Sequence, residues 1–382
     1  MKILINTIST KRFAGGAFQI SLNFIKRSLS WNDSSIEWHY LVSNDVDRQL
    51  RKEGYKIDSN YHVYPTQPNV HTYLKVKKCI RKLEESIKPD VVYSISAPSY
   101  FTFKSREVMR FTNPWVSHPN PYAWNILSHR ERIKMKFYIY LQKCMLRKAK
   151  YFITQTNLVK TNLIKLFHLP AKNIRVVPNV LPAFFLNEST AHINNEDNHI
   201  HIACIANSTK HKNLDIIPDV IKNLSDKHNI QNVVFHLSIP IQSQIWQKIE
   251  KQLDIYGIRN RAITHGRVDQ KALAEIYRHC DIAFIPTLLE VFSASGLEAA
   301  YFNLPIVATD FDFNREVFQD GCLYYKPTDA ADAAEKIADI IKNKEYYSEK
   351  TTNGNKSIIS KYGNYDEHFK CICDFLTNVH TI

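Results

Sequence analysis

Long apolar runs are missing from this sequence of 382 residues, and so is a regular cysteine pattern. The longest apolar stretches have the length of a strand, so no transmembrane helix is predicted. The segment from Lys2 to Asn6 is typical of a buried strand and lacks the cleavage site of a signal peptide. The seven cysteines are odd in number and lack framework spacing, which favours a reducing cytosol.

The composition is that of an ordinary globular protein. Hydrophobic residues make up 44% and charged residues 23%, which excludes extended disorder, collagen-like repeats and a coiled-coil rod. The length predicts two domains, each able to bury its own core. Cys371 and Cys373 form only a C-x-C pair, and two ligands do not make a zinc site, so no metal is expected there.

The positive charge is concentrated in one half of the chain. Residues 1–180 carry 30 Lys and Arg against 11 Asp and Glu, a net +19, whereas residues 181–382 carry 20 against 26, a net −6. Such asymmetry indicates that the first half meets an anionic surface. Nucleic acid, an anionic lipid leaflet and an acidic substrate are the candidates.

The densest basic stretch runs from Arg130 to Lys150 and holds eight Lys or Arg and one acid, Glu131. On a helix these cations form a stripe about 27 Å long. Each cation near an anionic leaflet contributes about 1 kcal/mol, so the stripe could hold a protein at a membrane; the alternative is an ordinary solvated face. The predicted membrane contacts are Arg132, Lys136, Lys143, Arg147 and Lys150. The apolar residues predicted beside them are Ile133, Phe137, Leu141 and Cys144.

Strand-sized and helix-sized segments alternate in both halves, which is typical of parallel sheets covered on both faces. We therefore predict an α/β protein with two doubly wound, Rossmann-like domains facing each other across a cleft. A short strand is expected at 111–112, and the polar segment near Asn187 indicates a linker. The predicted ranges are 1–185 for the N-terminal domain, 186–198 for the linker, 199–365 for the C-terminal domain and 366–382 for a helix that could pack back on the first domain.

The segment PTLLEVFSASGLEAAYFNLPIVATD, residues 286–310, has the richest chemistry. Glu290 is expected in a loop after a strand, and Glu298 in the first turn of a helix. The N–H donors at that helix N-terminus suit a diphosphate, while the acids suit sugar and ribose hydroxyls. Taken singly, each acid has a plainer interpretation, as an exposed loop acid for Glu290 and a helix-dipole partner for Glu298.

Taken in order, several segments resemble the retaining nucleotide-sugar glycosyltransferases of family four, which have the GT-B fold. Glu290 and Glu298, with seven residues between them, resemble the E-x7-E signature of that family. The resemblance covers residues 150–345 well and the N-terminal half in outline. The flanking segments that resemble the family are Gly15-Gly16, residues 174–180, Lys212-Asn213, and residues 264–287, 304–310 and 314–317.

Two departures from the family pattern affect the donor site. Val291 and Ser293 stand where the family usually has glycines, so their side chains narrow the approach to the sugar phosphate. Asn207 stands where the family usually has an arginine, which removes one cation from the diphosphate. Lys210 is the residue that could substitute for it, and Lys212 is the stronger candidate.

The resemblance implies that a nucleotide-diphosphate sugar binds the second domain. Lys212 and the helix amides would stabilise the leaving diphosphate, so no metal or other cofactor is expected. Glu298 would hold the ribose, and Glu290 would lie near the transferred sugar. The acceptor would lie on the first domain and attack with retention of configuration. The implied donor-binding residues are Gly16, Asn207, Lys210, Lys212, Arg267, Val268, Phe292, Ser293, Ala294, Ser295 and Glu298.

The first domain is expected to add a polar group near the anomeric carbon. Residues 111–125 offer His118, and a histidine suits hydrogen bonding near neutral pH. The alternative is a loop histidine without a role. The expected catalytic residues are therefore Glu290, His118 and Lys212. Asp310-Phe311-Asp312 matches a metal-binding D-x-D string of another glycosyltransferase fold, but it ends a strand in a different architecture.

These features predict a glycosyltransferase of cell-surface polysaccharide synthesis, such as lipopolysaccharide or capsule. It would act on a lipid-linked or other oligosaccharide acceptor in the cytoplasm, peripherally bound to the inner face of the cell membrane, without nucleic acid. One alternative is a nucleotide-sugar 2-epimerase, in which the basic stripe has no purpose. Others are a non-enzymatic nucleic-acid or membrane binder, although no RNA-binding signature is present, and a degenerate, inactive transferase.

Overall fold

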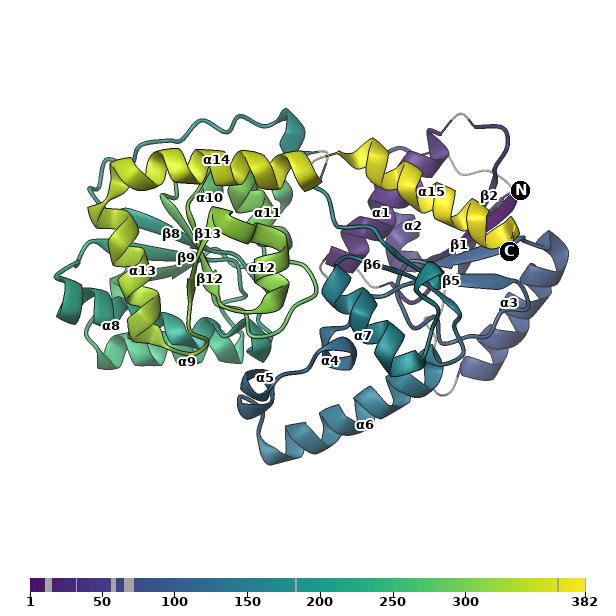
Figure 1. Cartoon of the computed structure of the whole chain (residues 1–382), viewed down its shortest axis with the longest axis horizontal. Coiled ribbons are helices and arrows are strands. Elements are labelled where there is room, and N and C mark those ends of the chain that lie inside the picture. The colour runs from purple at the N-terminus through teal and green to yellow at the C-terminus, as the bar shows by residue number, and fades with distance from the viewer. Residues whose placement is uncertain are drawn as a thin grey trace. The chain divides into compact units, whose positions relative to one another are not determined.

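The structure is a computed structural model and describes residues 1–10, 16–31, 33–55, 60–64, 72–182, 184–362 and 364–381. The chain forms two compact units, each built on its own parallel sheet (Figure 1). The N-terminal unit contains residues 1–117, 134–178 and 366–382, and the C-terminal unit contains residues 118–133 and 179–365. The predicted α/β class with two doubly wound sheets is confirmed.

The N-terminal sheet has the strand order β3-β2-β1-β4-β5-β6-β7, and its strands pair in parallel. Its strands are β1 (Lys2–Thr7), β2 (Glu37–Ser43), β3 (Tyr61–Tyr64), β4 (Val91–Ser94), β5 (Arg106–Arg110), β6 (Tyr151–Thr154) and β7 (Ile174–Val176). The helices of this unit are α1 (Gly16–Leu29), α2 (Asn44–Lys52), α3 (Tyr73–Ile87), α4 (Pro114–Ser117), most of α6 (His129–Leu146), α7 (Asn157–Phe167) and α15 (Tyr365–Thr381).

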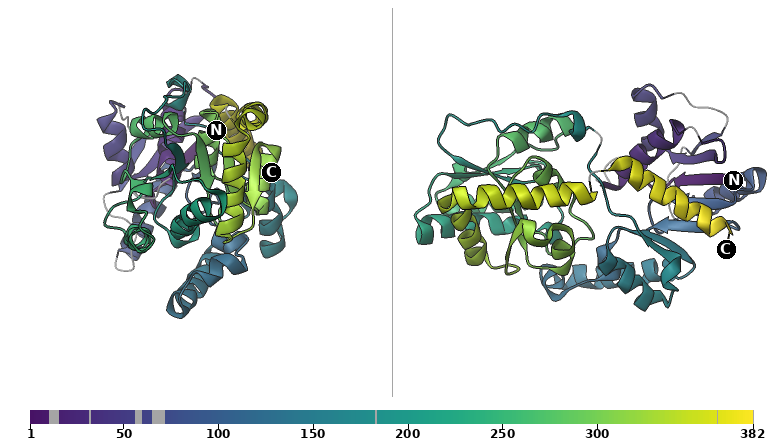
Figure 2. Two further views of the ribbon diagram at one scale, coloured as in Figure 1. Left: turned by 90° about the vertical axis from the view of Figure 1, so that its left-hand side faces the viewer. Right: turned by 45° about the horizontal axis from the view of Figure 1, so that its top comes forward.

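Both faces of this sheet are buried, because successive strand residues point to opposite sides. On one face Ile3 and Ile5 pack with α1 and with Phe369 and Leu376 of α15. On the other face Leu4 packs with α3. The last helix of the chain therefore belongs to the core of the first sheet, as Figure 2 also shows.

The C-terminal sheet has the order β10-β9-β8-β11-β12-β13, again with parallel pairing. Its strands are β8 (Ile200–Cys204), β9 (Val233–Leu237), β10 (Ala262–Thr264), β11 (Ile282–Ile285), β12 (Ile306–Thr309) and β13 (Cys322–Tyr325). The helices of this unit are α5 (Pro121–Asn125), α8 (Ile217–His228), α9 (Gln244–Ile255), α10 (Gln270–Arg278), α11 (Ala294–Tyr301), α12 (Asp312–Phe318), α13 (Ala330–Lys342) and α14 (Lys344–Tyr362).

Several expectations from the sequence differ from this fold. Residues 118–133 lie with the C-terminal unit rather than with the first domain, and that unit begins again at Asn179 rather than after a linker ending at 198. The short strand expected at 111–112 lies earlier, as β5 at residues 106–110. The fully buried Arg110 interrupts the apolar pattern by which this strand would be recognised. The helix α14 was not predicted, because its buried face includes the polar residues Thr351 and Asn355 and so gives no apolar stripe.

Within the described ranges, no helix combines the length and the apolar character needed to cross a membrane. The basic helix α6 ends at Leu146, so Arg147 and Lys150 do not continue its stripe as predicted. Its buried residues are Ile139, Gln142 and Leu146. The apolar stripe predicted beside the cations, from Ile133 to Cys144, is therefore not the face through which the helix packs.

Candidate functional site

The site lies at the carboxyl edge of the C-terminal sheet, where ligands bind in doubly wound folds. Loops after two neighbouring strands, β8 and β11, meet there: the loop after β8 carries Lys212 in a 3₁₀ turn, and the loop after β11 carries Glu290. The backbone joins the loops directly, since Leu288 N–H donates to the His211 carbonyl over 2.8 Å. The sheet topology thus brings together residues 78 positions apart.

Glu290 and Lys212 form a largely buried ion pair. Lys212 Nζ donates to Glu290 Oε1 over 2.6 Å, and the two side chains are 12% and 19% exposed, respectively. Glu290 Oε2 is also buried and has no hydrogen-bond partner among the described residues. Buried carboxylate oxygens are normally satisfied, so this atom is available to a ligand hydroxyl or amide.

Residues 118–133 join this loop through side chains. His118 Nε2 donates to the Glu290 carbonyl over 2.8 Å, and Asn120 Nδ2 donates to the Leu288 carbonyl over 2.7 Å. Burial lowers the pKa of His118 below its usual value, which leaves the ring neutral near pH 7. The neutral ring holds the Glu290 backbone and does not repel Lys212. His118 is therefore brought to the site within the C-terminal unit, and not by the first domain as predicted.

Glu298 is the fifth residue of α11 and lies at the start of its second turn rather than in the first as predicted, because the helix begins at Ala294. Its Oε2 accepts a hydrogen bond from the Tyr277 hydroxyl over 3.0 Å. Burial raises the pKa of Glu298 to about 7, although this hydrogen bond opposes the rise. Tyr277 on α10 was not predicted, and its only signal is its place in the segment 264–287 that carries the resemblance.

The N-terminus of α11 is partly used by its own cap. Ser293 is the N-cap, and its Oγ accepts from Gly296 N–H over 3.3 Å. Gly296 itself is required, because a Cβ there would overlap Phe318. The amides of Ala294 and Ser295 remain as the N–H donors suited to an anion.

Other predicted donor-binding residues lie in less direct positions. Asn207 Oδ1 is engaged locally by Thr209 N–H and Oγ1, over 3.1 and 2.5 Å. Phe292 is buried edge-on against Tyr362, so its ring does not face a ligand. Lys210 pairs with Glu131 over 2.7 Å and lowers the pKa of that carboxyl to about 2.

Three further predicted positions lie outside this cluster. Arg267 and Val268 follow β10 at the same sheet edge, after Gly266, whose φ of +71° suits glycine. Gly16 is the exposed first residue of α1 in the N-terminal unit, and Gly15 lies outside the described residues.

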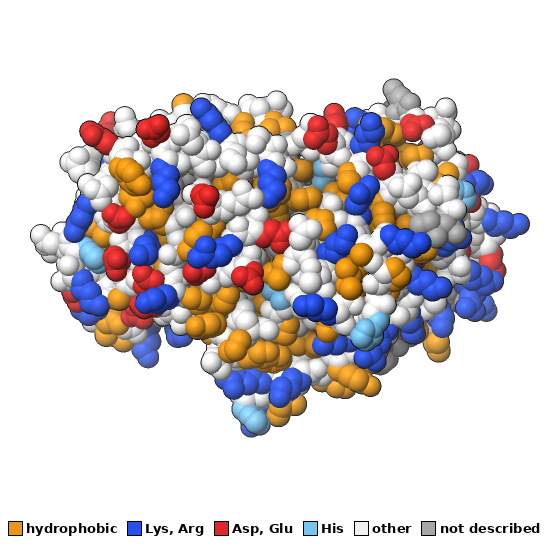
Figure 3. All heavy atoms as spheres, in the orientation of Figure 1, with side chains coloured by type: hydrophobic (Ala, Val, Ile, Leu, Met, Phe, Trp, Pro, Cys, Tyr) orange, Lys and Arg blue, Asp and Glu red, His pale blue; other side chains and the backbone are white. Residues whose placement is uncertain are grey.

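The predicted membrane contacts are only partly exposed. Lys136, Arg147 and Lys150 are exposed, and Lys143 is half-buried. Arg132 is not available as predicted, because its guanidinium donates to the carbonyls of Leu127 and Asn125. Large apolar side chains are exposed on the same helix, and Figure 3 shows them beside Lys and Arg. They are Ile133, Phe137, Tyr138, Tyr140 and Leu141.

No group of three or more metal-ligating side chains occurs in the part of the chain that the structure describes. Asp310 of the D-x-D string is bound through both oxygens by the Arg315 guanidinium, over 2.5 and 2.8 Å. The nearest cation to Glu290 is the Lys212 ammonium. Lys212 thus contributes positive charge at this site.

Comparison with known proteins relates part of this chain to a family. Residues 187–357 match the family model of the glycosyl transferases group 1. The O-antigen chain mannosyltransferase RfbU of Salmonella typhimurium is 21% identical over 197 residues, which cover 52% of this chain and 52% of RfbU. The alignment thus spans about half the length of that curated relative.

Solved structures match the whole chain. A glycosyltransferase from Rickettsia africae has a TM-score of 0.71 at 14% identity and covers 99% of this chain and 98% of its own. HepE of Anabaena, solved in complex with UDP and glucose, has a TM-score of 0.71 at 14% identity and covers 99% and 100%. At this identity the likeness shows the fold, which is that of GT-B glycosyltransferases.

Proposed function

We propose that this chain, whose residues 187–357 belong to the glycosyl transferases group 1, transfers a sugar from a nucleotide-diphosphate donor to a saccharide acceptor. The observation that carries the proposal is the state of Glu290. One of its oxygens is held by Lys212, and the other is buried and unpartnered among the described residues. A donor sugar bearing hydroxyls would satisfy the second oxygen, and its diphosphate would meet the Lys212 ammonium.

Each residue then has a defined task in the transfer. Lys212, with the free amides at the start of α11, would stabilise the charge that develops on the leaving diphosphate. Neutral His118 would fix the Glu290 loop through its carbonyl, and the Glu298 carboxylate would accept from the ribose hydroxyls. Arg267 and Val268 would border the base, and no metal is needed for these tasks.

The finer features of the reaction follow from the predicted resemblance. We propose retention of anomeric configuration and an acceptor bound on the N-terminal unit. That acceptor would be lipid-linked, as expected for cell-surface polysaccharide synthesis, and the enzyme would lie on the inner face of the cell membrane. Exposed apolar and cationic side chains on α6 support the membrane contact.

The activity is tested by measuring release of nucleoside diphosphate from a panel of nucleotide sugars in the presence of glycan acceptors. We expect one donor to be used, Lys212→Met to lose most turnover and Glu298→Gln to raise the donor KM. The matched control is Lys251→Met, an exposed lysine of α9, which should behave like wild type. Interconversion of the nucleotide sugar without diphosphate release would overturn the proposal in favour of an epimerase.

Co-sedimentation with anionic vesicles tests the membrane contact. Reversal of charge at Lys136, Arg147 and Lys150 should release the protein, because about 1 kcal/mol per cation is lost and repulsion is added. Reversal of the charge at Lys165, an exposed lysine of α7, is the control that shows the effect of one charge change outside α6. If binding survives the triple reversal, these cations are ordinary solvated residues and not a membrane contact. Binding to DNA instead of vesicles would favour a nucleic-acid binder.

A further inference from the structure

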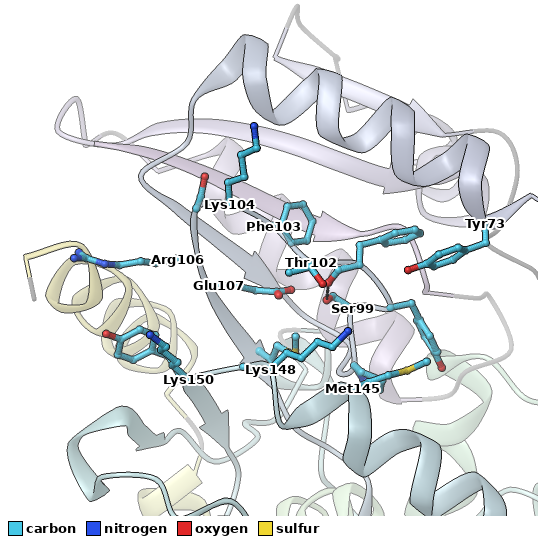
Figure 4. Close-up of a pocket in the computed structure, with 17 residues that line it drawn as sticks. Tyr73, Ser99, Thr102, Phe103, Lys104, Arg106, Glu107, Met145, Lys148 and Lys150 are labelled. Carbon is cyan, nitrogen blue, oxygen red and sulfur yellow. Dashed lines mark hydrogen bonds between the residues drawn. The ribbon is translucent and has the colours of Figure 1, made fainter.

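The N-terminal unit contains a cavity of about 300 Å³ that lies outside the proposed donor site. It lies on one face of the sheet between α3 and α6, and its walls include the first residues of β5 and β6 (Figure 4). Its lining also includes Pro98 to Phe101, which follow the carboxyl end of β4, so the cavity runs along the face of the sheet. It shares no residue with the predicted donor-binding set, and its size suits small molecules.

Hydroxyl-binding groups line the inner part of this cavity. Glu107 lies there, and its Oε1 accepts a hydrogen bond from Ser94 Oγ over 2.5 Å. Removal from water raises the pKa of Glu107 to about 7, with Ser94 and Ser99 opposing the rise. Figure 4 shows Ser99, Thr102 and Glu107 directed toward one another. Carboxyl and hydroxyl groups in such a cluster suit a ligand with several hydroxyls.

Cations give the cavity a positive balance. Among the described residues that line it, four are Lys or Arg and only Glu107 is an acid. Lys104 pairs with Glu85, and Arg106 donates to carbonyls of α15. Lys148 and Lys150 form no ion pair with any described residue, and Figure 4 shows Lys148 extending toward Ser99 and Glu107. An anionic group would neutralise Lys148.

Apolar side chains are exposed beside the cavity. Tyr100 lines it and is 39% exposed. Tyr138 of α6, whose pKa is raised by burial and by the nearby Tyr100, is 44% exposed. Leu141 is 40% exposed and lies one helical turn before Met145, which lines the cavity. A ligand with an apolar tail would cover these side chains, whereas a free phosphate ester would leave them exposed.

We propose that this cavity binds the headgroup of an anionic lipid that carries hydroxyls next to its phosphate. The hydroxyls bond to Glu107, Ser99 and Thr102, the phosphate pairs with Lys148, and the acyl chains lie along Tyr100, Tyr138 and Leu141. By recognising this headgroup, the cavity would favour binding of α6 to a leaflet that contains the lipid. The proposal rests on the membrane contact of α6 and is independent of sugar transfer.

Two vesicle compositions distinguish headgroup recognition from simple charge attraction. Phosphatidylglycerol carries one negative charge and two free hydroxyls, whereas phosphatidylserine carries the same net charge and no hydroxyl. Full-length protein should bind vesicles with phosphatidylglycerol at least about tenfold more tightly at equal mole fraction, a factor that corresponds to two or more hydrogen bonds. Equal binding to both vesicles, or to neither, would overturn the proposal.

Variants locate the preference in the cavity. Glu107→Ala removes negative charge, so charge attraction alone predicts tighter binding to both vesicles, whereas the proposal predicts weaker binding to phosphatidylglycerol. Thr102→Val changes an exposed hydroxyl without disturbing the core and should reduce the same preference. Lys148→Ala should weaken binding to phosphatidylglycerol, because the phosphate in the cavity loses its cation. The matched control Lys136→Ala should weaken binding to both vesicles by about fivefold.

The source of the phosphate is tested by competition with soluble sn-glycerol phosphate. Little displacement is expected, because the soluble ester lacks the acyl chains. Efficient displacement, or a wild-type preference in Glu107→Ala and Thr102→Val together, would overturn a lipid site. A wild-type protein that releases diphosphate but shows no vesicle preference refutes the cavity proposal alone. A wild-type protein that shows the preference but releases no diphosphate refutes the transfer alone.

Discussion

Replacing Lys212 separates the structural role of its ion pair from its proposed role in transfer. The ammonium and the Glu290 carboxylate are 2.6 Å apart and mostly shielded from water. Breaking a buried pair costs about 3–5 kcal/mol, because the remaining charge is left unpaired. Both side chains keep some solvent contact, so we expect about 3 kcal/mol for Lys212→Met. For a unit of this size that lowers the midpoint of thermal unfolding by about 6–12 °C.

A double-variant cycle gives the sharper measurement. Glu290→Gln leaves Lys212 unpaired, whereas the variant with both changes leaves no unpaired charge. We therefore expect the double variant to be about 2 kcal/mol more stable than the sum of the single changes predicts, measured by calorimetry. Coupling below about 0.5 kcal/mol, as for independent sites, would refute the buried-pair argument.

Turnover should follow a different pattern in the same variants. Loss of a preorganised positive group at the leaving diphosphate lowers kcat by about 10²–10³-fold. Stability returns in the double variant, but the cation does not, so kcat should stay low. A double variant that recovers both stability and turnover would show that Lys212 only balances Glu290.

Three other predictions concern α11 and its surroundings. The pKa of Glu298 in the folded state, about 7, lies above its ordinary value of 4.5, so the unfolded state ionises first and the free energy of unfolding should fall as pH rises between these values. Glu298→Gln should flatten that fall in denaturant titrations on either side of the window, and an unchanged slope would contradict the assignment. Tyr277→Phe removes a hydrogen bond that favours the Glu298 carboxylate, so the donor KM should rise more than kcat changes, and the pH profile of KM should move upward; a profile that does not move would leave Tyr277 a packing residue. Gly296→Ala should cost about 1–3 kcal/mol by overlap with Phe318, whereas Gly16→Ala, with open space around it, is the control; equal stabilities would show that α11 can shift.

The sequence predicted what depends on local pattern. Alternating strands and helices gave the two parallel sheets, since the two periods differ and buried strands read as short apolar runs. The ordered segments around Glu290 and Glu298 predicted the glycosyltransferase resemblance, which the family match and the GT-B fold confirm. The loop position of Glu290 and the helical position of Glu298 were also predicted, whereas the N-cap at Ser293 came from the structure.

Long-range packing defined what the local pattern did not contain. Residues 118–133 read as part of the first domain, because His118 and Asn120 meet the Glu290 loop only after the chain has folded. Arg110 masked β5, since a buried arginine breaks the apolar signal of a strand. Tyr277 gave no sign of its contact with Glu298, 21 positions later, because the two residues meet through sheet topology.

The amino-acid order alone thus determined the fold class and the acids of the site, because helix and strand periods and cap residues act over a few positions. The tertiary structure decided the surroundings of those acids. Burial raised the pKa of Glu298, and the crossing of two loops paired Glu290 with Lys212 and left Glu290 Oε2 without a partner among the described residues. Desolvation and pairing depend on neighbours brought together in space, and no spacing along the chain encodes them.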